Sequence, residues 1–278
     1  MKKRVALIYG GKSQEREISL LTGQQVSSAL VEKGFHVTGL DLDDNVVTAL
    51  AEARPDVVFI ALHGKYGEDG CLQGLLDILG LPYVGSGVLA SALAMNKAIS
   101  KKLFSLEGLL CPKDVLLSSC ALRKAGLEGM IAQIARDMAY PLVVKPNKQG
   151  STIGLTVVRA SEDLESSILN AFKYDDEVLV EEYISGTEIT VGVLGNDQPQ
   201  ALPVIEIRSV TGLYGYEAKY TPGMSEHVIP AEIEDHVYRT VQEGALKAHR
   251  ALGCRGISRS DFIVTPGDET YILEVNTI

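Results

Sequence analysis

The sequence predicts a mixed fold, in which an open parallel α/β unit precedes segments of α+β type. Two observations indicate this order. In the first third of the chain, continuous apolar runs alternate with helical patterns, which is typical of parallel strands covered on both faces. From Thr187 onwards the expected strands lengthen and helices become fewer. The length of 278 residues allows roughly two domains of about 150 residues each.

The first unit begins with a strand expected at 5–9, and its other elements continue the alternation. We expect helices near 18–33, 46–53 and 71–79, and strands near 37–41, 57–62 and 82–84. The loops 10–15 and 63–70 follow two of these strands. Because ligands of open α/β sheets bind at the carboxyl ends of the strands, both are candidate ligand loops.

The middle of the chain predicts a small α+β domain. We expect helices near 97–106, 130–138 and 161–171, and strands near 115–117, 142–145, 155–158 and 178–182. The last part should hold strands at 188–194 and 201–207, an irregular stretch at 209–230, a helix at 235–251, and final strands at 259–264 and 270–276. The expected domains are 1–95, 96–184 and 185–278.

The composition excludes several classes of protein. The chain has 26 Lys and Arg residues against 36 Asp and Glu residues, a formal charge of −10. An acidic chain repels phosphates unless it clusters cations locally, so we expect no nucleic-acid partner. No apolar stretch approaches the roughly 18 residues of a membrane span, and the four cysteines form no C-x-x-C pair. We expect a cytoplasmic protein with reduced thiols and no membrane partner.

Both N-terminal loops carry residues with more than one interpretation. A phosphate-binding P-loop ending at Gly11-Lys12-Ser13 would need its first glycine at position 6, where the chain has alanine, so that motif is absent. Glu15 near a helix start either complements the helix dipole or holds a substrate ammonium. His63 is followed by three glycines, which allow close approach of the backbone to a ligand; a structural histidine is the alternative.

Two segments of the middle domain point to a nucleotide. Lys145 closes an apolar strand, and the loop at 146–154 that follows has small polar residues around two glycines. Such a loop can wrap phosphate oxygens, and an exposed hairpin turn is the alternative. Main-chain groups beyond the strand at 178–182 can pair with an adenine edge, and Glu188 can accept a ribose hydroxyl. Solvated acidic residues are the alternative there.

The C-terminal hairpin gives the sharpest signal. Its strands flank a Pro-Gly-Asp turn, and pairing Val264 with Tyr271 fixes the register. This register sets two further pairs opposite each other: Asp261 with Glu274, and Arg259 with Asn276. Side chains two apart share a face, so two carboxylates and an amide oxygen converge. Hard oxygen ligands suit Mg²⁺, and a cross-strand ladder of salt bridges is the alternative.

In this order, the motifs resemble those of the D-alanine–D-alanine ligases, which are members of the ATP-grasp superfamily. The resemblance spans essentially the whole chain, through residues 10–15, 63–70, 96–97, 145–154, 181–188, 216–220 and 259–276. It implies an ATP-grasp fold with an N-terminal open parallel-sheet domain, a central ATP-binding domain and a C-terminal metal-binding domain. It also implies an ADP-forming enzyme that joins two D-alanine molecules through an acylphosphate, for peptidoglycan synthesis, cell wall biogenesis and cell shape.

The resemblance implies a role for each site residue. ATP would be held through its phosphates by Lys97, Lys145 and Lys219, with a contact from Ser151, and through adenosine by Glu181, Tyr183, Ile184 and Glu188. Two Mg²⁺ ions, for which Mn²⁺ can substitute, would bind Asp261, Glu274 and Asn276. The first D-alanine would place its ammonium on Glu15 and its carboxylate near His63. Arg259 would stabilise charge at the reacting centre, and Ser151 and Tyr220 would link two loops to Glu15.

Two departures from the family pattern stand out. Glu182 occupies a position where the family often has a lysine beside the adenine. Family members also continue past the position of Ile278, with a segment that supplies an oxyanion contact and the site of the second D-alanine carboxylate, so the last domain is expected to look truncated. The resemblance implies a homodimer. Another ATP-grasp carboxylate–amine ligase, or a non-catalytic nucleotide-binding protein, are the alternative functions.

Overall fold

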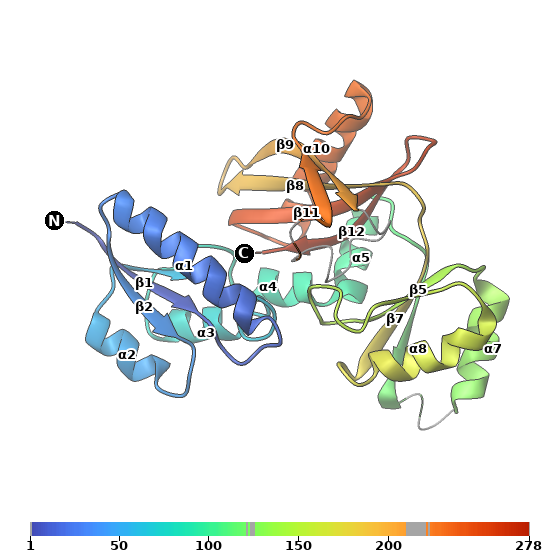
Figure 1. The fold of residues 1–278 in the computed structure, drawn as a ribbon, viewed down its shortest axis with the longest axis horizontal. Helices are drawn as coiled ribbons and strands as arrows, with labels where there is room; N and C mark the ends of the chain where they lie inside the picture. Colours follow the sequence, from blue (N-terminus) through green and yellow to red (C-terminus); the bar gives the residue numbers. More distant parts are fainter. Residues whose placement is uncertain (1, 121, 123–125, 210–220, 222, 278) are drawn as a thin grey trace.

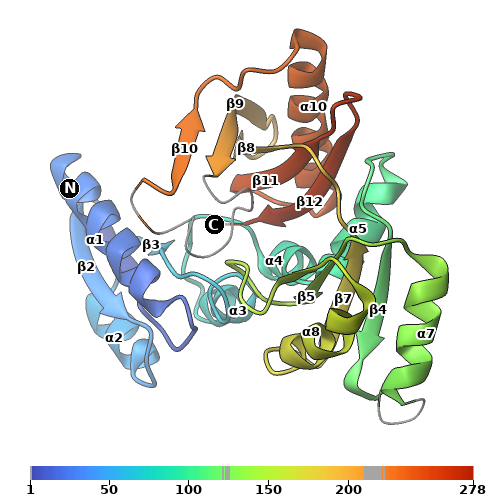
Figure 2. The ribbon, with the colours of Figure 1, turned by 45° about the vertical axis from the view of Figure 1, so that its right-hand side comes forward.

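The computed structural model describes residues 2–120, 122, 126–209, 221 and 223–277. These residues form three units, each built on a sheet of its own (Figure 1). Figure 2 shows the C-terminal sheet above the central one, with helices α4 and α5 between them. Within this part of the chain, no helix is long and apolar enough to cross a membrane.

The N-terminal unit is a parallel sheet with helices on both faces, as the sequence predicts. Its elements are β1 (Arg4–Tyr9), α1 (Arg16–Glu32), β2 (His36–Asp41), α2 (Val46–Ala53), β3 (Val57–Ile60) and α3 (Cys71–Ile78). Strand β1 lies between β2 and β3. Ala6 and Ile8 pack into the core shared with α2 and α3, whereas Tyr9 lies against Gly23 of α1. Because strand side chains alternate, the helices lie on opposite faces.

The strand expected at 82–84 is reduced to a single bridge. Only Tyr83 pairs with β3, through Val58. Pro82 has no N–H group to donate, which limits the ladder that this edge can form.

A helix that the sequence analysis did not include leads into the next unit. Helix α4 (Val88–Met95) is followed by α5 (Lys97–Leu106), and Asn96 separates them in an extended conformation. The side chain of Asn96 accepts a hydrogen bond from the Ile99 N–H at 3.2 Å. Asn96 therefore caps α5 and fixes Lys97 as its first residue.

The central unit is an antiparallel sheet in the order β4-β7-β5-β6. Its elements are β4 (Asp114–Ser118), α7 (Leu127–Asp137), β5 (Leu142–Pro146), β6 (Thr156–Val158), η1 (Ser161–Asp163), α8 (Leu164–Ala171) and β7 (Glu177–Glu182). Ile134 of α7 and Ile168 of α8 are fully buried in the core beneath the sheet. The helix expected over 161–171 thus begins with a 3-10 turn. The other face of the sheet lies toward the C-terminal unit (Figure 2).

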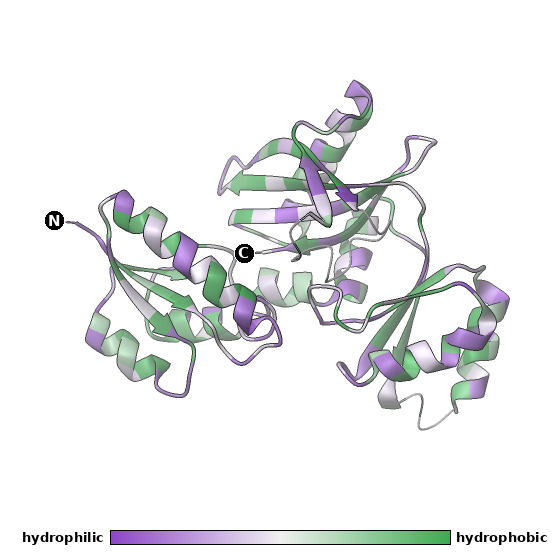
Figure 3. Ribbon diagram, in the orientation of Figure 1, coloured by the Kyte–Doolittle hydropathy of each residue, from purple (hydrophilic) through white to green (hydrophobic). Residues whose placement is uncertain are grey.

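The C-terminal unit is an antiparallel sheet in the order β10-β9-β8-β11-β12. Its elements are β8 (Thr187–Gly195), β9 (Gln200–Ser209), β10 (Ser225–Val228), α10 (Asp235–Ala251), β11 (Gly256–Val264) and β12 (Thr270–Asn276). Val241 and Ala245 of α10, with Phe104 of α5, cover one face of the sheet. Figure 3 shows the largely hydrophobic colouring of β8, which lies within this core. The opposite face of the sheet lines the cavity that is described below.

Strand β10 lies in a stretch that the sequence analysis expected to be irregular. Ser225 to Val228 pair with the end of β9, from Ser209 back to Glu206. None of the four residues is buried, so the strand has no apolar alternation from which it could be predicted.

Candidate active site

A cavity of about 750 Å³ lies where the three units meet. The N-terminal loops, the loop after β5, the segment after β7 and strands β8, β9, β11 and β12 all contribute to its lining. Every predicted site residue within the described part of the chain lines this cavity: Glu15, His63, Lys97, Lys145, Ser151, Glu181, Tyr183, Ile184, Glu188, Arg259, Asp261, Glu274 and Asn276. Lys219 and Tyr220 lie outside the described residues.

The terminal hairpin has the predicted register at its end near the cavity. Both expected pairs are present: Asp261 with Glu274, and Arg259 with Asn276. The pairing of Val264 with Tyr271 is wrong, because Val264 pairs with Thr270 and Tyr271 pairs with Ile263. The register shifts by one residue between the turn and the cavity.

A β-bulge at Leu273 explains the shift. The register passes from Ile272, opposite Phe262, directly to Glu274, opposite Asp261. Ile272 and Val275 therefore both enter the core although they are three residues apart. In a regular strand Ile272 and Glu274 would share a face. The bulge turns Glu274 out of the core and toward the cavity.

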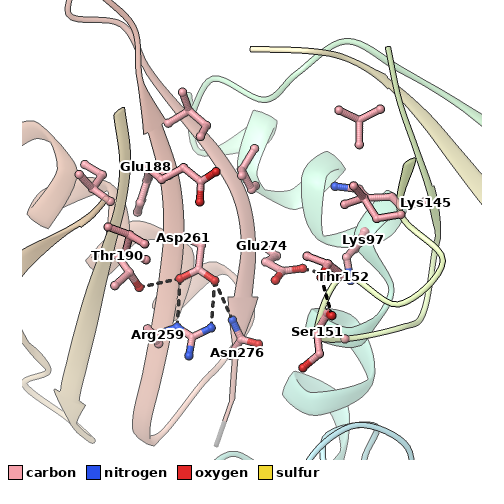
Figure 4. Close-up of a pocket in the computed structure, with 18 of the residues that line it drawn as sticks. Lys97, Lys145, Ser151, Thr152, Glu188, Thr190, Arg259, Asp261, Glu274 and Asn276 are labelled. Carbon is pink, nitrogen blue, oxygen red and sulfur yellow. Dashed lines mark hydrogen bonds and ion pairs between the residues drawn. The ribbon is translucent and has the colours of Figure 1, made fainter. Parts of the chain in front are cut away.

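Asp261 is the centre of a hydrogen-bond network on this wall of the cavity (Figure 4). Thr190 Oγ1 donates to Asp261 Oδ1 at 2.6 Å, and Asn276 Nδ2 donates to Oδ2 at 3.2 Å. The Arg259 guanidinium donates one hydrogen bond of 3.0 Å to each carboxylate oxygen. Asp261 in turn raises the pKa of Arg259. These contacts fix the carboxylate in one orientation.

The oxygen atoms on this wall suit a divalent cation of the Mg²⁺ class. Asp261 and Glu274 offer carboxylates and Asn276 offers an amide oxygen, all hard ligands. In the residues that the structure describes, no three His, Cys, Asp or Glu side chains gather into a group that would hold a metal by themselves. A cation here would complete its shell with ligand and water oxygens, as Mg²⁺ commonly does.

Lys97 joins the hairpin to the loop after β5. From the first turn of α5, its Nζ lies 3.1 Å from Glu274 Oε2 and donates a hydrogen bond of 2.7 Å to the Gln149 carbonyl. Figure 4 shows Lys97 between Glu274 and the loop that carries Ser151. The side chain is buried, so its charge acts in a medium where electrostatic interactions are strong.

Lys145 lies in strand β5 of the central sheet, across the cavity from the hairpin (Figure 4). It is paired with a buried carboxylate. Its Nζ is 2.5 Å from Glu181 Oε2, and Glu181 Oε1 accepts a hydrogen bond of 2.6 Å from Lys101. Burial by itself raises the pKa of Glu181, but the two lysines outweigh it and the pKa is lowered. Glu181 is therefore an ionised carboxylate inside the protein.

The segment after β7 crosses to the C-terminal sheet along the cavity. Tyr183 is fixed by its N–H, which donates a hydrogen bond of 3.1 Å to the Pro141 carbonyl. Further along, a Cβ at Gly186 would lie 2.2 Å from the Val264 carbonyl oxygen, so only glycine fits at this crossing. The Glu182 carboxylate accepts a hydrogen bond of 2.7 Å from the Lys113 N–H.

Glu15 is enclosed by two loops that come from different units. It precedes α1, as the sequence indicates, but its side chain makes no capping hydrogen bond. Instead Ser151 Oγ donates a hydrogen bond to Glu15 Oε1. A Cβ would lie 2.5 Å from Glu15 Oε2 at Gly64 and 3.0 Å from it at Gly150. The two glycines let both loops close on the carboxylate.

A histidine and a second carboxylate lie beside Glu15. The Nε2 atom of His63 is 2.9 Å from Thr22 Oγ1, and burial lowers the pKa of the imidazole, which favours the neutral ring. Glu68 accepts a hydrogen bond of 2.7 Å from the Gly64 N–H. Its pKa is raised to about 7, first by burial and then by the charge of Glu15.

Known proteins match the chain over nearly its whole length. The family model described as D-ala D-ala ligase C-terminus matches residues 113–278, and the model for the N-terminus matches residues 43–86. The D-alanine–D-alanine ligase of Pelotomaculum thermopropionicum is 48% identical over 100% of the chain and 87% of its own length. That of Desulforamulus reducens is 46% identical over 100% and 89%. The chain belongs to the D-alanine–D-alanine ligase family.

Solved structures agree in fold with this membership of the ligase family. The D-alanine–D-alanine ligase of Bacillus anthracis complexed with ATP has a TM-score of 0.82 at 31% identity, with 99% of this chain and 86% of that chain covered. The VanG D-Ala:D-Ser ligase of Enterococcus faecalis also has a TM-score of 0.82, at 33% identity, with 100% and 91% covered. The ATP-grasp fold predicted from the sequence is confirmed.

Three residues in or directly behind this candidate site were missed by the sequence analysis. Thr190 could not be found because the sequence analysis did not predict that β8 pairs with β11. This pairing sets Thr190 opposite Asp261. Lys101 follows Lys97 by one helical turn, and that spacing on α5 was the available signal. Glu68 stands in the predicted ligand loop, where a carboxylate close to His63 was the signal.

Proposed function

We propose that the chain is an ATP-dependent ligase that joins two D-alanine molecules to give D-alanyl-D-alanine, ADP and phosphate. One observation carries this conclusion: residues predicted for nucleotide, metal and amino acid, far apart in the sequence, line one cavity where the three units meet. The product would serve peptidoglycan synthesis in the cytoplasm. A homodimer is part of the proposal by family resemblance.

The nucleotide end of the cavity is defined by Lys145 and Glu181. We place the adenine near Tyr183 and Ile184, where main-chain groups follow β7, and the ribose near Glu188. The phosphates would extend toward Lys145 and Lys97, with Ser151 and Lys219 as further contacts. Buried lysines in an otherwise acidic chain are the local cations that an anionic ligand requires.

The hairpin lies between the two ends and would hold two Mg²⁺ ions, or Mn²⁺, through Asp261, Glu274 and Asn276. Bound there, the ions would neutralise charge on the transferring phosphoryl group. The chain supplies the positions of these oxygens. Thr190 and Arg259 fix Asp261, and the bulge at Leu273 aims Glu274 into the cavity.

The amino-acid end is defined by Glu15, His63 and Glu68. We place the ammonium of the first D-alanine on Glu15, whose buried carboxylate is held by Ser151, with its carboxylate near His63. Arg259 lies on the adjoining wall of the cavity, where its guanidinium can stabilise negative charge that develops in the reaction.

The proposed reaction has two steps. A carboxylate oxygen of the first D-alanine attacks the γ-phosphorus of ATP, and the bond to the ADP oxygen breaks. The amine of the second D-alanine then attacks the carbonyl carbon of the acylphosphate, phosphate leaves, and the nitrogen loses a proton. An acylphosphate is hydrolysed by water, so the loop at 147–154, with Tyr220, would cover the site.

Phosphate release with an amino-acid panel tests the proposal. The full-length protein with ATP and Mg²⁺ should release phosphate only when D-alanine is added, with D-alanyl-D-alanine formed in equal amount. Turnover with other carboxylate–amine pairs, and not with D-alanine, would assign it to another ATP-grasp ligase. Binding of ATP with no release under any amino acid would make it a non-catalytic nucleotide-binding protein.

A further inference from the structure

Lys101 is a buried lysine that the proposed reaction does not use. It lies on α5 one turn after Lys97, and its side chain is 4% exposed. Its Nζ is 2.6 Å from Glu181 Oε1 and 2.8 Å from Asp114 Oδ1. Glu181 lines the cavity, whereas Lys101 does not belong to the described residues that line it. Lys101 therefore touches the site only through Glu181.

Each oxygen of Glu181 is held by a different lysine. Lys145 binds Oε2 from the cavity side and Lys101 binds Oε1 from behind. A buried carboxylate that pairs with a single lysine would cancel the positive charge of that lysine. Separating two such buried charges is strongly unfavourable. With two lysines, the group of Lys145, Glu181 and Lys101 has a net charge of one positive unit. Asp114, the further partner of Lys101 at 2.8 Å, does not belong to the described residues that line the cavity, so Lys145 is the member of this group whose positive charge faces a ligand.

We propose that Lys101 is a positioning residue for the nucleotide. It keeps Glu181 ionised and fixed, so that Lys145 can direct its charge to the phosphates while Glu181 accepts a hydrogen bond from the amino group of the adenine. This inference rests on the nucleotide site of the proposed function. It does not depend on which amino acids the enzyme joins.

Replacement of the ammonium tests the inference directly. Lys101→Met keeps most of the length of the side chain and should weaken ATP–Mg²⁺ binding, measured by calorimetry, by at least about tenfold, as expected for loss of a charge-assisted interaction. The KM for D-alanine should stay within about twofold, since only the nucleotide end is altered. Lys101→Arg should restore ATP affinity, and Lys102→Met, an exposed neighbour on the same helix, serves as the matched control.

The pH dependence of ATP binding distinguishes a positioning role of Lys101 from a general loss of structure. In Lys101→Met the pKa of Glu181 should rise, because a positive charge beside it is gone. The loss of ATP affinity should then grow as the pH falls and Glu181 becomes protonated, a dependence that a merely structural defect would not produce.

The double variant Lys101→Met/Glu181→Gln keeps the test valid if the single variant folds poorly, because no unpaired buried carboxylate remains. If Lys101 acts through Glu181, the double variant should bind ATP within about twofold of Glu181→Gln alone. An equal loss from Lys101→Met in both backgrounds, equal effects on ATP and D-alanine, or unchanged ATP affinity would overturn the inference. Calorimetry needs no turnover, so a failure of D-alanine-dependent phosphate release would be seen separately.

Discussion

The two ends of the cavity proposed for the nucleotide and for the amino acid place carboxylates in opposite environments. At the nucleotide end, Glu181 lies between Lys101 and Lys145, and its pKa is lowered in spite of burial. At the amino-acid end, Glu68 has Glu15 near it, and burial together with this negative charge raises the pKa of Glu68 to about 7. Glu181 is buried and Glu68 is partly buried. The neighbouring charges decide which of them stays ionised.

This difference assigns a ligand charge to each end. At the nucleotide end two lysines flank the buried Glu181, and one of them, Lys145, lines the cavity, so a polyanion is favoured there. Two carboxylates share the amino-acid end, so a cationic group such as an ammonium is favoured there, and its arrival should lower the pKa of Glu68. The hairpin acids, Asp261 and Glu274, lie between these two ends.

The largest effect is expected where the two ends meet. Glu274→Gln removes a proposed metal ligand and the ion pair with Lys97, and should lower kcat by at least about a hundredfold, the scale of losing transition-state charge stabilisation. Phosphate release measures this, and the Tm should stay close to that of the original chain. Glu269→Gln, at an exposed position in the turn of the same hairpin, should retain full activity. An unchanged kcat in Glu274→Gln would remove the metal assignment.

Loss of a cation at the nucleotide end should act on ATP alone. Lys145→Met leaves Glu181 with Lys101 as its counterion and removes a phosphate contact, so the Kd for ATP should rise by about 10- to 100-fold. Calorimetry with ATP and Mg²⁺ measures the change. Lys173→Met, at an exposed position of the same unit, is the matched control. Unaltered nucleotide affinity in Lys145→Met would show that Lys145 does not bind the phosphates.

Loss of a negative charge at the amino-acid end should weaken the binding of D-alanine and leave that of ATP unchanged. Glu15→Gln should raise the KM for D-alanine by about tenfold, as expected when an ammonium loses its charged partner, and should leave ATP affinity unchanged. It should also lower the pKa of Glu68, because the charge of Glu15 is one of its causes. Steady-state kinetics in each substrate checks the first expectation. Equal changes for D-alanine and ATP would abolish the distinction between the two ends.

The smallest effect is on stability and depends on pH. The raised pKa of Glu68 means that the protonated group favours the folded chain. The stabilisation by protonated Glu68 is complete at a pH below the pKa that this carboxyl has in the unfolded chain. It is lost as the pH rises through about 7. Glu68→Gln should therefore be more stable than the original chain by roughly 1 to 3 kcal/mol at about pH 8, with the gap closing toward about pH 4. Denaturant unfolding measures it, and a gap that does not vary with pH would contradict the assignment.

The sequence predicts most elements of the fold because their signals are local. The helix over Asp235–Ala251 and the strand over Thr270–Asn276 have the bounds expected from apolar periodicity and turn residues. Strand β10 could not be predicted, because it is held by pairing with β9 and buries no side chain. The helix α4, rich in small residues, lacked an amphipathic pattern.

Residues of the candidate site could be predicted where a motif or a hairpin brings them together. The pair of Asp261 and Glu274 was predicted from an anchor, Val264 with Tyr271, that is one residue off, and the bulge at Leu273 compensates for this error. The bulge itself could not be predicted, since it depends on how Ile272 and Val275 both reach the core. Lys101 and Thr190 belong to contacts between elements far apart in the chain, and no local pattern specifies such contacts.

Mn²⁺ binding in the presence of ATP tests the central claim, that the hairpin oxygens bind divalent cations on the nucleotide phosphates. Paramagnetic resonance should detect two tightly bound Mn²⁺ ions per chain when ATP is present. In the double variant Asp261→Asn/Glu274→Gln this tight binding should be lost, while the variant remains folded. If the variant bound as many Mn²⁺ ions as tightly as the original chain, the hairpin would not be the metal site and the account of the reaction would be contradicted.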